Sequence, residues 1–130
     1  MLLGGLGKEV TLYVDLLDAL KYHGYEPLKI IYITSPEVKK KVFESYGEDK
    51  LKNAEFVVFP YTDVLRENIE ILLETSRNIV EKYVHQYEPL IDLTGGTKPT
   101  SLALLKTAQE YNLKALYFSG RKIIWINKPY

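Results

Sequence analysis

The chain has 130 residues, of which 46% are hydrophobic, and this length and composition predict one globular domain rather than a disordered segment. Its 17 basic and 17 acidic residues balance, which argues against a protein that coats DNA or RNA in bulk. Cysteine is absent, so disulfides, thiolate metal sites and cysteine nucleophiles are excluded.

The sequence gives no sign of a membrane or secretory segment. No apolar run approaches the ~20 residues of a membrane helix, and residues 1–5 lack the basic start of a signal peptide. We therefore expect a cytoplasmic protein.

His23 and His85 lie far apart, each near the end of an expected helix, so we expect no metal site. A composition poor in Met and Cys but rich in Tyr, Lys, Glu and Ile indicates a thermophilic source.

The first expected unit is a short strand at residues 2–3, a glycine-rich turn and a helix that begins at residues 8–9 and ends at Gly24. The apolar side chains of this helix recur at helical spacing, at Val10, Tyr13, Val14, Leu17 and Leu20. The turn is either a flexible N-terminus or a binding loop. We favour the binding loop, because such turns gather at the carboxyl ends of strands in an α/β sheet. Its candidate ligand-binding residues are Gly5, Leu6, Gly7 and Lys8.

The second expected strand covers residues 29–34, and Ser35 followed by Pro36 begins a helix that ends at Gly47. The buried side of this helix is expected to carry Val38, Val42, Phe43 and Tyr46. The three lysines at 39–41 are therefore read as a solvated face rather than a nucleic-acid site. Residues 48–50 match a nuclease Glu-x-Lys pattern, but they lie in a polar link and we reject that reading.

The third expected strand covers residues 55–61, and Thr62 or Asp63 caps a helix that runs to about Gln86. A single helix of this length is expected to cover the sheet and extend past it. Part of it is therefore a candidate dimer interface.

The most informative stretch is an apolar strand at residues 89–93 followed by the turn Thr94, Gly95, Gly96, Thr97 and Lys98. Pro99 is expected at the first helical position, which would hold Lys98 on the turn. Glycines allow close backbone approach, and N–H groups, a helix N-terminus and a lysine together favour an anion. We predict a phosphate-binding turn. The alternative is a tight turn with a solvated lysine. The pattern is neither a P-loop nor a dinucleotide fingerprint.

The helix after this turn is expected to bury Leu102, Leu105 and Ala108 and to end at Asn112. Strands at residues 114–118 and 123–127, joined by a four-residue turn, predict an antiparallel hairpin. The alternation of elements predicts an α/β, Rossmann-like three-layer sandwich with a mostly parallel sheet. Its ligand would bind at the carboxyl ends of the strands, near both glycine turns, Thr34 and Ser35.

Residues 92–98, Asp-Leu-Thr-Gly-Gly-Thr-Lys, resemble the signature of the CARF domain, the CRISPR-associated Rossmann fold. The order of elements, including the terminal hairpin, extends the resemblance over nearly all of residues 1–130, as a single domain. Two features depart from the family. The first strand is shorter than usual, and Pro99 with Thr100 follow the motif lysine where an apolar residue is often found.

The resemblance implies a homodimer that binds cyclic oligoadenylate, the messenger of type III CRISPR antiviral defence, across its two-fold axis. The glycine turns would meet phosphates, and polar strand ends would meet adenine edges. Since no effector domain follows in this sequence, such a domain would either destroy the messenger or sense it for a separate partner.

Our first hypothesis is a ring nuclease without metal or cofactor, with cyclic tetra-adenylate as the favoured ligand. A ribose 2′-OH attacks the adjacent phosphodiester and leaves a 2′,3′-cyclic phosphate, with Lys98 and Thr97 as catalytic residues and Lys8 as a second positive contact. No general base is obvious, so slow turnover is expected. The alternatives are a non-catalytic sensor and an unrelated nucleotide-binding α/β domain. Asp92 is expected to order the turn rather than hold a ribose hydroxyl.

Overall fold

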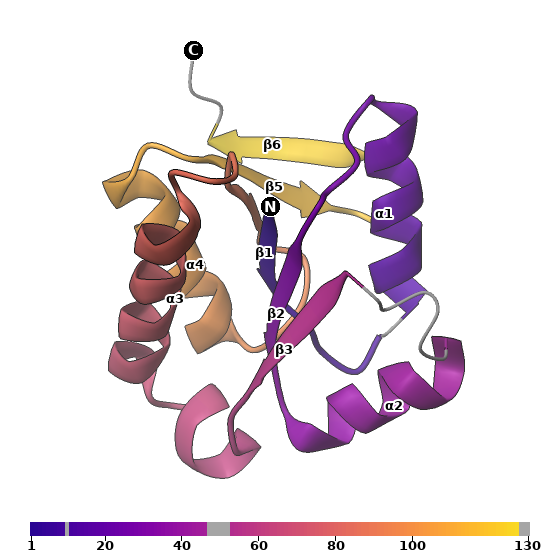
Figure 1. Cartoon of the computed structure of the whole chain (residues 1–130). Coiled ribbons are helices and arrows are strands. Elements are labelled where there is room, and N and C mark those ends of the chain that lie inside the picture. Colours follow the sequence, from indigo (N-terminus) through magenta and orange to yellow (C-terminus); the bar gives the residue numbers. More distant parts are fainter. Residues whose placement is uncertain (10, 47–52, 128–130) are drawn as a thin grey trace.

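The structure, a computed structural model, describes residues 1–9, 11–46 and 53–127 (Figure 1). The expectations for Val10, Gly47 and residues 48–50 lie outside this part of the chain. Its elements follow in the order β1 Leu2–Gly5, α1 Thr11–Tyr22, β2 Ile30–Thr34, α2 Pro36–Tyr46, β3 Ala54–Val58, η2 Tyr61–Leu65, α3 Ile69–Tyr83, β4 Leu90–Asp92, α4 Lys98–Glu110, β5 Lys114–Phe118 and β6 Ile123–Asn127.

The strands form one six-stranded sheet in the order β3-β2-β1-β4-β5-β6. Strands β1 to β5 run parallel, and β6 pairs antiparallel with β5. This confirms the predicted α/β, Rossmann-like fold with a C-terminal hairpin. The register places Gly4 of β1 between Tyr32 of β2 and Asp92 of β4, an arrangement that matters for the site below.

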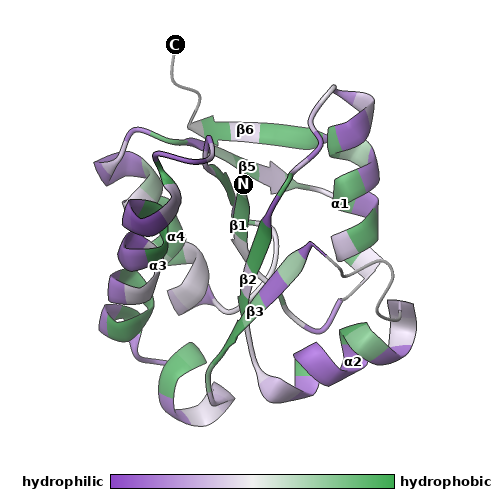
Figure 2. Cartoon of the chain, in the orientation of Figure 1, coloured by the Kyte–Doolittle hydropathy of each residue, from purple (hydrophilic) through white to green (hydrophobic). Residues whose placement is uncertain are grey.

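Helices α1 and α2 cover one face of the sheet, and α3 and α4 cover the other (Figure 1). Strand residues alternate between the two faces, so Ile30 and Tyr32 join the core under α1 while Ile31 joins the core under α4. Hydrophobic residues run along the strands, and the outer sides of the helices are largely hydrophilic (Figure 2). Parallel strands covered on both faces explain why β1 and β2 are buried throughout.

The residues that α1 buries differ in part from the apolar residues predicted to face the core. Tyr13, Leu16 and Leu20 are buried, whereas Leu17 is only partly buried at the margin of the core. The end at Gly24 is confirmed by its positive φ of 84°, a conformation that glycine adopts without a steric penalty.

The expected long helix from residue 62 or 63 to about 86 is wrong. A short π-helix, η2, ends at Leu65, and α3 begins anew after Asn68, whose side chain accepts a hydrogen bond from the N–H of Ile71 at 3.2 Å. An asparagine cap supplies the acceptor that a helix start requires, so the chain breaks here although its apolar spacing continues. Helix α3 then packs along α4, where the buried hydroxyls of Ser76 and Thr107 lie 2.6 Å apart.

Helix α4 corrects two further expectations. Lys98 is its first residue and Thr97 its N-cap, so Pro99 lies one position later than predicted. Leu102 is 56% exposed, and the inward side is carried by small and hydroxyl residues, namely Thr100, Ala103, Leu104, Thr107 and Ala108. Such side chains let the helix approach β1 and α3 closely. The predicted end at Asn112 is confirmed by its φ of 52°, in the left-handed region.

Candidate functional site

Two glycine turns pack directly against each other at the carboxyl ends of β1 and β4. The first turn covers residues 5–8 and the second covers residues 94–98. A Cβ on Gly95 would lie 2.7 Å from the carbonyl oxygen of Gly5, and a Cβ on Gly5 would lie 3.0 Å from the carbonyl oxygen of Gly95. Gly96 adopts a φ of 87°. The glycines thus permit a backbone contact between the turns, which we call the turn contact. Close approach of a ligand, the reason predicted from the sequence, is not the only use of these glycines.

The predicted polar residues Thr34, the last of β2, and Ser35, which follows it, hold the backbone around this contact. The hydroxyl of Thr34 donates to the carbonyl oxygen of Leu6 at 2.7 Å, which ties the end of β2 to the first turn. Ser35 caps α2, because its hydroxyl accepts a hydrogen bond from the N–H of Val38 at 3.2 Å. Thr34 therefore has a clear structural role, and it lines neither of the two hollows described below.

The threonines of the second turn are engaged in the same way. The Thr94 hydroxyl accepts from the N–H of Phe118 at 2.9 Å, which joins the turn to β5. The Thr97 hydroxyl donates to the carbonyl oxygen of Leu65 in η2 and accepts from the N–H of Thr100 at 3.4 Å. Thr97 therefore fixes the start of α4, and with it the backbone position of Lys98.

A hollow of about 880 Å³, which we call the basic hollow, opens on the side of α2, η2 and α4. Its charged lining residues are Lys8, Lys41, Arg66 and Lys98, opposed only by Glu37 among the described residues. The N-termini of α2 and α4 also open on it, and their backbone dipoles favour an anion. Lys41 donates to the carbonyl oxygen of Lys8 at 3.1 Å and so links α2 to the first turn.

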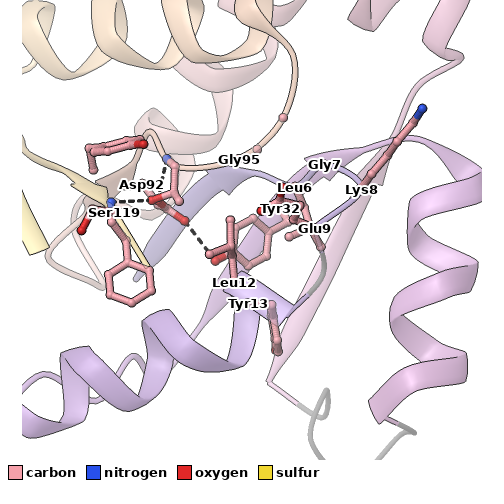
Figure 3. A pocket seen from close by; sticks show the side chains of 15 residues that line it. Leu6, Gly7, Lys8, Glu9, Leu12, Tyr13, Tyr32, Asp92, Gly95 and Ser119 are labelled. Carbon is pink, nitrogen blue, oxygen red and sulfur yellow. Dashed lines mark hydrogen bonds between the residues drawn. The ribbon is translucent and has the colours of Figure 1, made fainter. Parts of the chain in front are cut away.

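A second hollow of about 340 Å³, which we call the acidic hollow, lies on the α1 side of the turn contact (Figure 3). It is lined by both glycine turns and by Glu9, Leu12, Tyr13, Tyr32, Asp92, Tyr117, Phe118 and Ser119. The two hollows share Leu6, Gly7, Lys8 and Gly96, so only the turn contact separates them.

Asp92, 2% exposed, lies in the acidic hollow beside Tyr32 (Figure 3). Its carboxylate accepts from the Tyr32 hydroxyl at 3.1 Å and from the N–H of Thr94 at 2.9 Å. The bond to Thr94 confirms that Asp92 orders the turn. Burial raises the pKa of Asp92, and hydrogen bonds from the hydroxyl and N–H of Thr94 and from the Tyr32 hydroxyl partly oppose that rise. Burial, with the neighbouring carboxylate, raises the pKa of Tyr32 well above its usual value.

Gly4 makes the Asp92–Tyr32 pair possible. A Cβ on Gly4 would lie 2.8 Å from the ring of Tyr32 and 2.9 Å from the Cβ of Asp92. Tyr13 of α1 packs on Tyr32 with ring centroids 5.5 Å apart, and burial raises the pKa of Tyr13 to about 12. Both tyrosines therefore remain protonated hydrogen-bond donors at neutral pH.

The structure brings most of the predicted site residues together and divides them between the hollows. Thr97, Lys98 and Ser35 line the basic hollow, Gly5, Thr94 and Gly95 line the acidic hollow, and Leu6, Gly7, Lys8 and Gly96 line both. The sequence analysis missed several residues that also line them, namely Glu9, Tyr32, Lys41, Arg66, Tyr117 and Ser119. A tyrosine between the isoleucines of β2 was the one available signal.

Within residues 1–9, 11–46 and 53–127, no three Asp, Glu or His side chains gather closely enough to hold a metal ion. Over the same residues, no helix combines the length and apolar character that a membrane crossing requires. The cytoplasmic location and the thermophilic source expected from composition stay predictions.

The sequence matches no protein-family model and no curated protein. Solved structures do resemble this fold. Can2 from Sulfobacillus thermosulfidooxidans, in complex with cyclic tetra-adenylate, superposes with a TM-score of 0.65 at 15% identity over 96% of this chain. Protein VC1899 from Vibrio cholerae gives a TM-score of 0.68 at 17% identity, again over 96% of this chain.

Csm6 from Enterococcus italicus, bound to cyclic hexa-2′-fluoro-hexa-dAMP, gives a TM-score of 0.63 at 12% identity over 91% of this chain. The matched regions cover 34%, 33% and 32% of the three solved chains, so this chain spans about a third of their length. At such low identities, the likeness establishes the fold.

Proposed function

From the CARF-like fold of this chain, we propose that it binds cyclic oligoadenylate, with cyclic tetra-adenylate favoured, and cleaves it as a ring nuclease in type III CRISPR antiviral signalling. The observation that carries the proposal is the basic hollow beside the second glycine turn, residues 94–98. Four cationic side chains and two helix N-termini converge there, at the end of the sheet where α/β proteins bind ligands. Can2, which shares the fold, is in complex with cyclic tetra-adenylate.

The basic hollow suits the phosphodiester groups of the ring. Lys98 lies on the first turn of α4 and Lys8 on the first glycine turn, so they approach the hollow from two elements. Lysine provides a mobile point charge, whereas the guanidinium of Arg66 can bind two phosphate oxygens at once. The single carboxylate of Glu37 leaves a clear excess of positive charge among the described lining residues.

The proposed reaction is transesterification within the ring. A ribose 2′-oxygen forms a bond to the adjacent phosphorus, the bond from phosphorus to the 5′-oxygen breaks, and the 2′-hydroxyl proton is transferred so that a 5′-hydroxyl leaves. The products carry 2′,3′-cyclic phosphate ends, and the step requires no metal. Lys98 stabilises the negative charge that grows on the phosphoryl oxygens. Thr97, whose hydroxyl is engaged with Leu65, contributes by positioning the start of α4.

The proposal includes a homodimer. Tyr117, Ile124 and Ile126 are between 39% and 50% exposed. Tyr117 and its partner Ile124 share the sheet face that α3 and α4 cover elsewhere, since Ala115, two residues before Tyr117, joins the core under α4. Ile126 lies next to them, at a shift in the register between β5 and β6. These side chains are only partly covered by the described part of the chain. Tyr117 also lines the acidic hollow, so a second copy packed on this face would lie beside the ligand.

Light scattering on the purified protein should therefore give the mass of a dimer, and Ile124→Glu should give a monomer with weaker ring binding. The matched control is Tyr22→Glu on the outside of α1, where an exposed aromatic residue lies far from this face. A wild-type monomer that binds the ring at full affinity would contradict the dimer.

A sensor that binds the ring without cleaving it is the second candidate. Two observations favour it. The hydroxyls of Thr94 and Thr97 are already engaged in the fold, and no histidine is among the residues described as lining either hollow. Both candidates use the same hollows, so only measured cleavage separates them.

The test is incubation of the protein with radiolabelled cyclic tetra-adenylate in EDTA, followed by separation of the products. Linear di-adenylate with a cyclic phosphate end, lost in Lys98→Ala but retained in Lys106→Ala on the exposed side of α4, would support the nuclease. Tight binding without products would support the sensor. Binding of ATP but of no cyclic oligoadenylate would favour the third reading, an unrelated nucleotide-binding domain.

A further inference from the structure

The acidic hollow has a chemistry that the phosphate-binding role does not explain. Two acidic side chains line it, Glu9 at its rim and the buried Asp92 beside Tyr32. Among the lining residues that the structure describes, the only basic one is Lys8, whose amine points away from Asp92 and Tyr32 (Figure 3). The hollow therefore offers hydrogen-bond acceptors, which suit a neutral donor group far better than a phosphate.

The floor of this hollow is rigid and still has acceptor capacity. An ionised carboxylate accepts about four hydrogen bonds, and the described contacts of Asp92 come from the Tyr32 hydroxyl and from the N–H and hydroxyl of Thr94. These bonds fix the plane of the carboxylate and leave room for a further donor. A ligand that enters the hollow meets an acceptor whose orientation is already set, which lowers the entropic cost of binding.

The walls and the size of the hollow suit a flat aromatic ring. Leu12 of α1 and the edges of the nearly buried rings of Tyr13 and Phe118 border the polar floor. The volume of about 340 Å³ falls within the ~300–1,000 Å³ that is usual for small-molecule sites. Aromatic side chains stack on nucleobases without regard to sequence, so selection among bases depends on the polar floor.

We propose that the acidic hollow binds a purine base of the ligand and that Asp92 selects adenine by accepting a hydrogen bond from its exocyclic 6-amino group. Guanine and hypoxanthine carry a carbonyl oxygen at that position, which would face the carboxylate without a proton between them. Such a mismatch leaves a buried acceptor unpaired and is costly. Tyr32 acts as a positioning residue, because its hydroxyl holds the carboxylate.

This inference rests on the proposed function, since it assigns a base of the same ring to the hollow next to the phosphates. The geometry supports that division. The hollows share Leu6, Gly7, Lys8 and Gly96, so a nucleotide that lies across the turn contact reaches both. Its phosphate would meet the basic hollow and its base the acidic one.

The test compares the binding of cyclic tetra-adenylate with that of cyclic tetra-inosinate, in which hypoxanthine replaces adenine. We expect the wild-type protein to prefer the adenylate by about 10- to 100-fold. Asp92→Asn keeps an oxygen for the N–H of Thr94 and offers an amide donor to the ligand. It should therefore weaken adenylate binding, strengthen inosinate binding and abolish or invert the preference.

Asp18→Asn, on the exposed side of α1, is the matched control and should keep the wild-type preference. Circular dichroism verifies that both variants fold. Equal wild-type affinity for the two rings, or an unchanged preference in folded Asp92→Asn, would overturn the base assignment and leave the proposed function intact. Failure of the wild-type protein to bind either ring would overturn both proposals.

Discussion

The two hollows lie on opposite sides of the same turn contact, yet they hold their charged groups in different ways. Lys8, Lys41, Arg66 and Lys98 of the basic hollow are all exposed. Asp92 of the acidic hollow is 2% exposed and has its hydrogen-bond partners within the fold. The cations are therefore screened by salt, and apart from Lys41, which donates to the carbonyl oxygen of Lys8, they retain rotamer freedom, whereas the carboxylate is fixed before any ligand arrives.

This difference separates two kinds of contribution to recognition. Exposed cations attract any polyanion, and their effect on affinity falls as salt rises. A buried, oriented acceptor adds little general attraction but penalises a ligand that lacks the matching donor. The basic hollow should thus set how tightly the ring binds, and the acidic hollow should set which ring binds.

The largest effect is expected at the turn contact, on which both hollows depend. Gly95→Val would place a Cβ 2.7 Å from the carbonyl oxygen of Gly5, so the two turns must separate. We expect unfolding to become easier by about 2–3 kcal/mol in urea titrations, and ligand binding to be lost on both sides.

Gly24→Ala is the control for this change. Gly24 has a φ of 84°, and a Cβ added there would have no atom within 4 Å. The alanine variant therefore introduces backbone strain without a steric clash. It should cost about 1 kcal/mol and leave binding unchanged. If Gly95→Val bound the ring normally, the two turns would not be the site.

The buried carboxylate predicts a pH effect that the exposed cations do not. Because burial raises the pKa of Asp92, the folded protein takes up this proton at a higher pH than the unfolded chain does. Protonation therefore favours the folded state, and ionisation at higher pH costs stability. The free energy of unfolding of the wild type, minus that of Asp92→Asn, should rise as the pH falls from neutral toward the ordinary value of 3.8.

The size of that rise is about 1.4 kcal/mol for each pH unit between the folded and unfolded pKa values. Urea titrations of both proteins between pH 4 and 8 measure it, and the subtraction cancels the other titrating groups. If the difference between the two free energies of unfolding stays constant with pH, Asp92 has the same pKa in the folded protein as in the unfolded chain.

Much of the fold was predictable because it depends on local pattern. Alternating strands and helices predict the parallel sheet, and the short link at residues 119–122 predicts the hairpin. The break at Asn68 was not predictable in the same way, because the apolar spacing continues through it. The inward side of α4 was missed since alanine and threonine carry it, while the exposed Leu102 looked like a core residue.

The site was predictable where the motif is contiguous and not where it is assembled across the chain. Residues 94–98 stand out in the sequence, and the structure places them beside the first glycine turn. Tyr32 and Arg66 join the site only through β-sheet register and the η2 break, which local pattern does not reveal. Hydroxyls that looked like ligand contacts, as in Thr34 and Thr97, are used by the fold instead.

The smallest effect tests one of these missed residues. Arg66 follows η2 and lines the basic hollow, so Arg66→Ala should weaken binding of cyclic tetra-adenylate by about 3- to 10-fold at low salt. It should leave stability unchanged, because the side chain is exposed. The loss of affinity in Arg66→Ala should become smaller as the salt concentration rises, and the preference for adenylate over inosinate should remain. A change in that preference would mean that the two hollows do not divide affinity and selectivity between them.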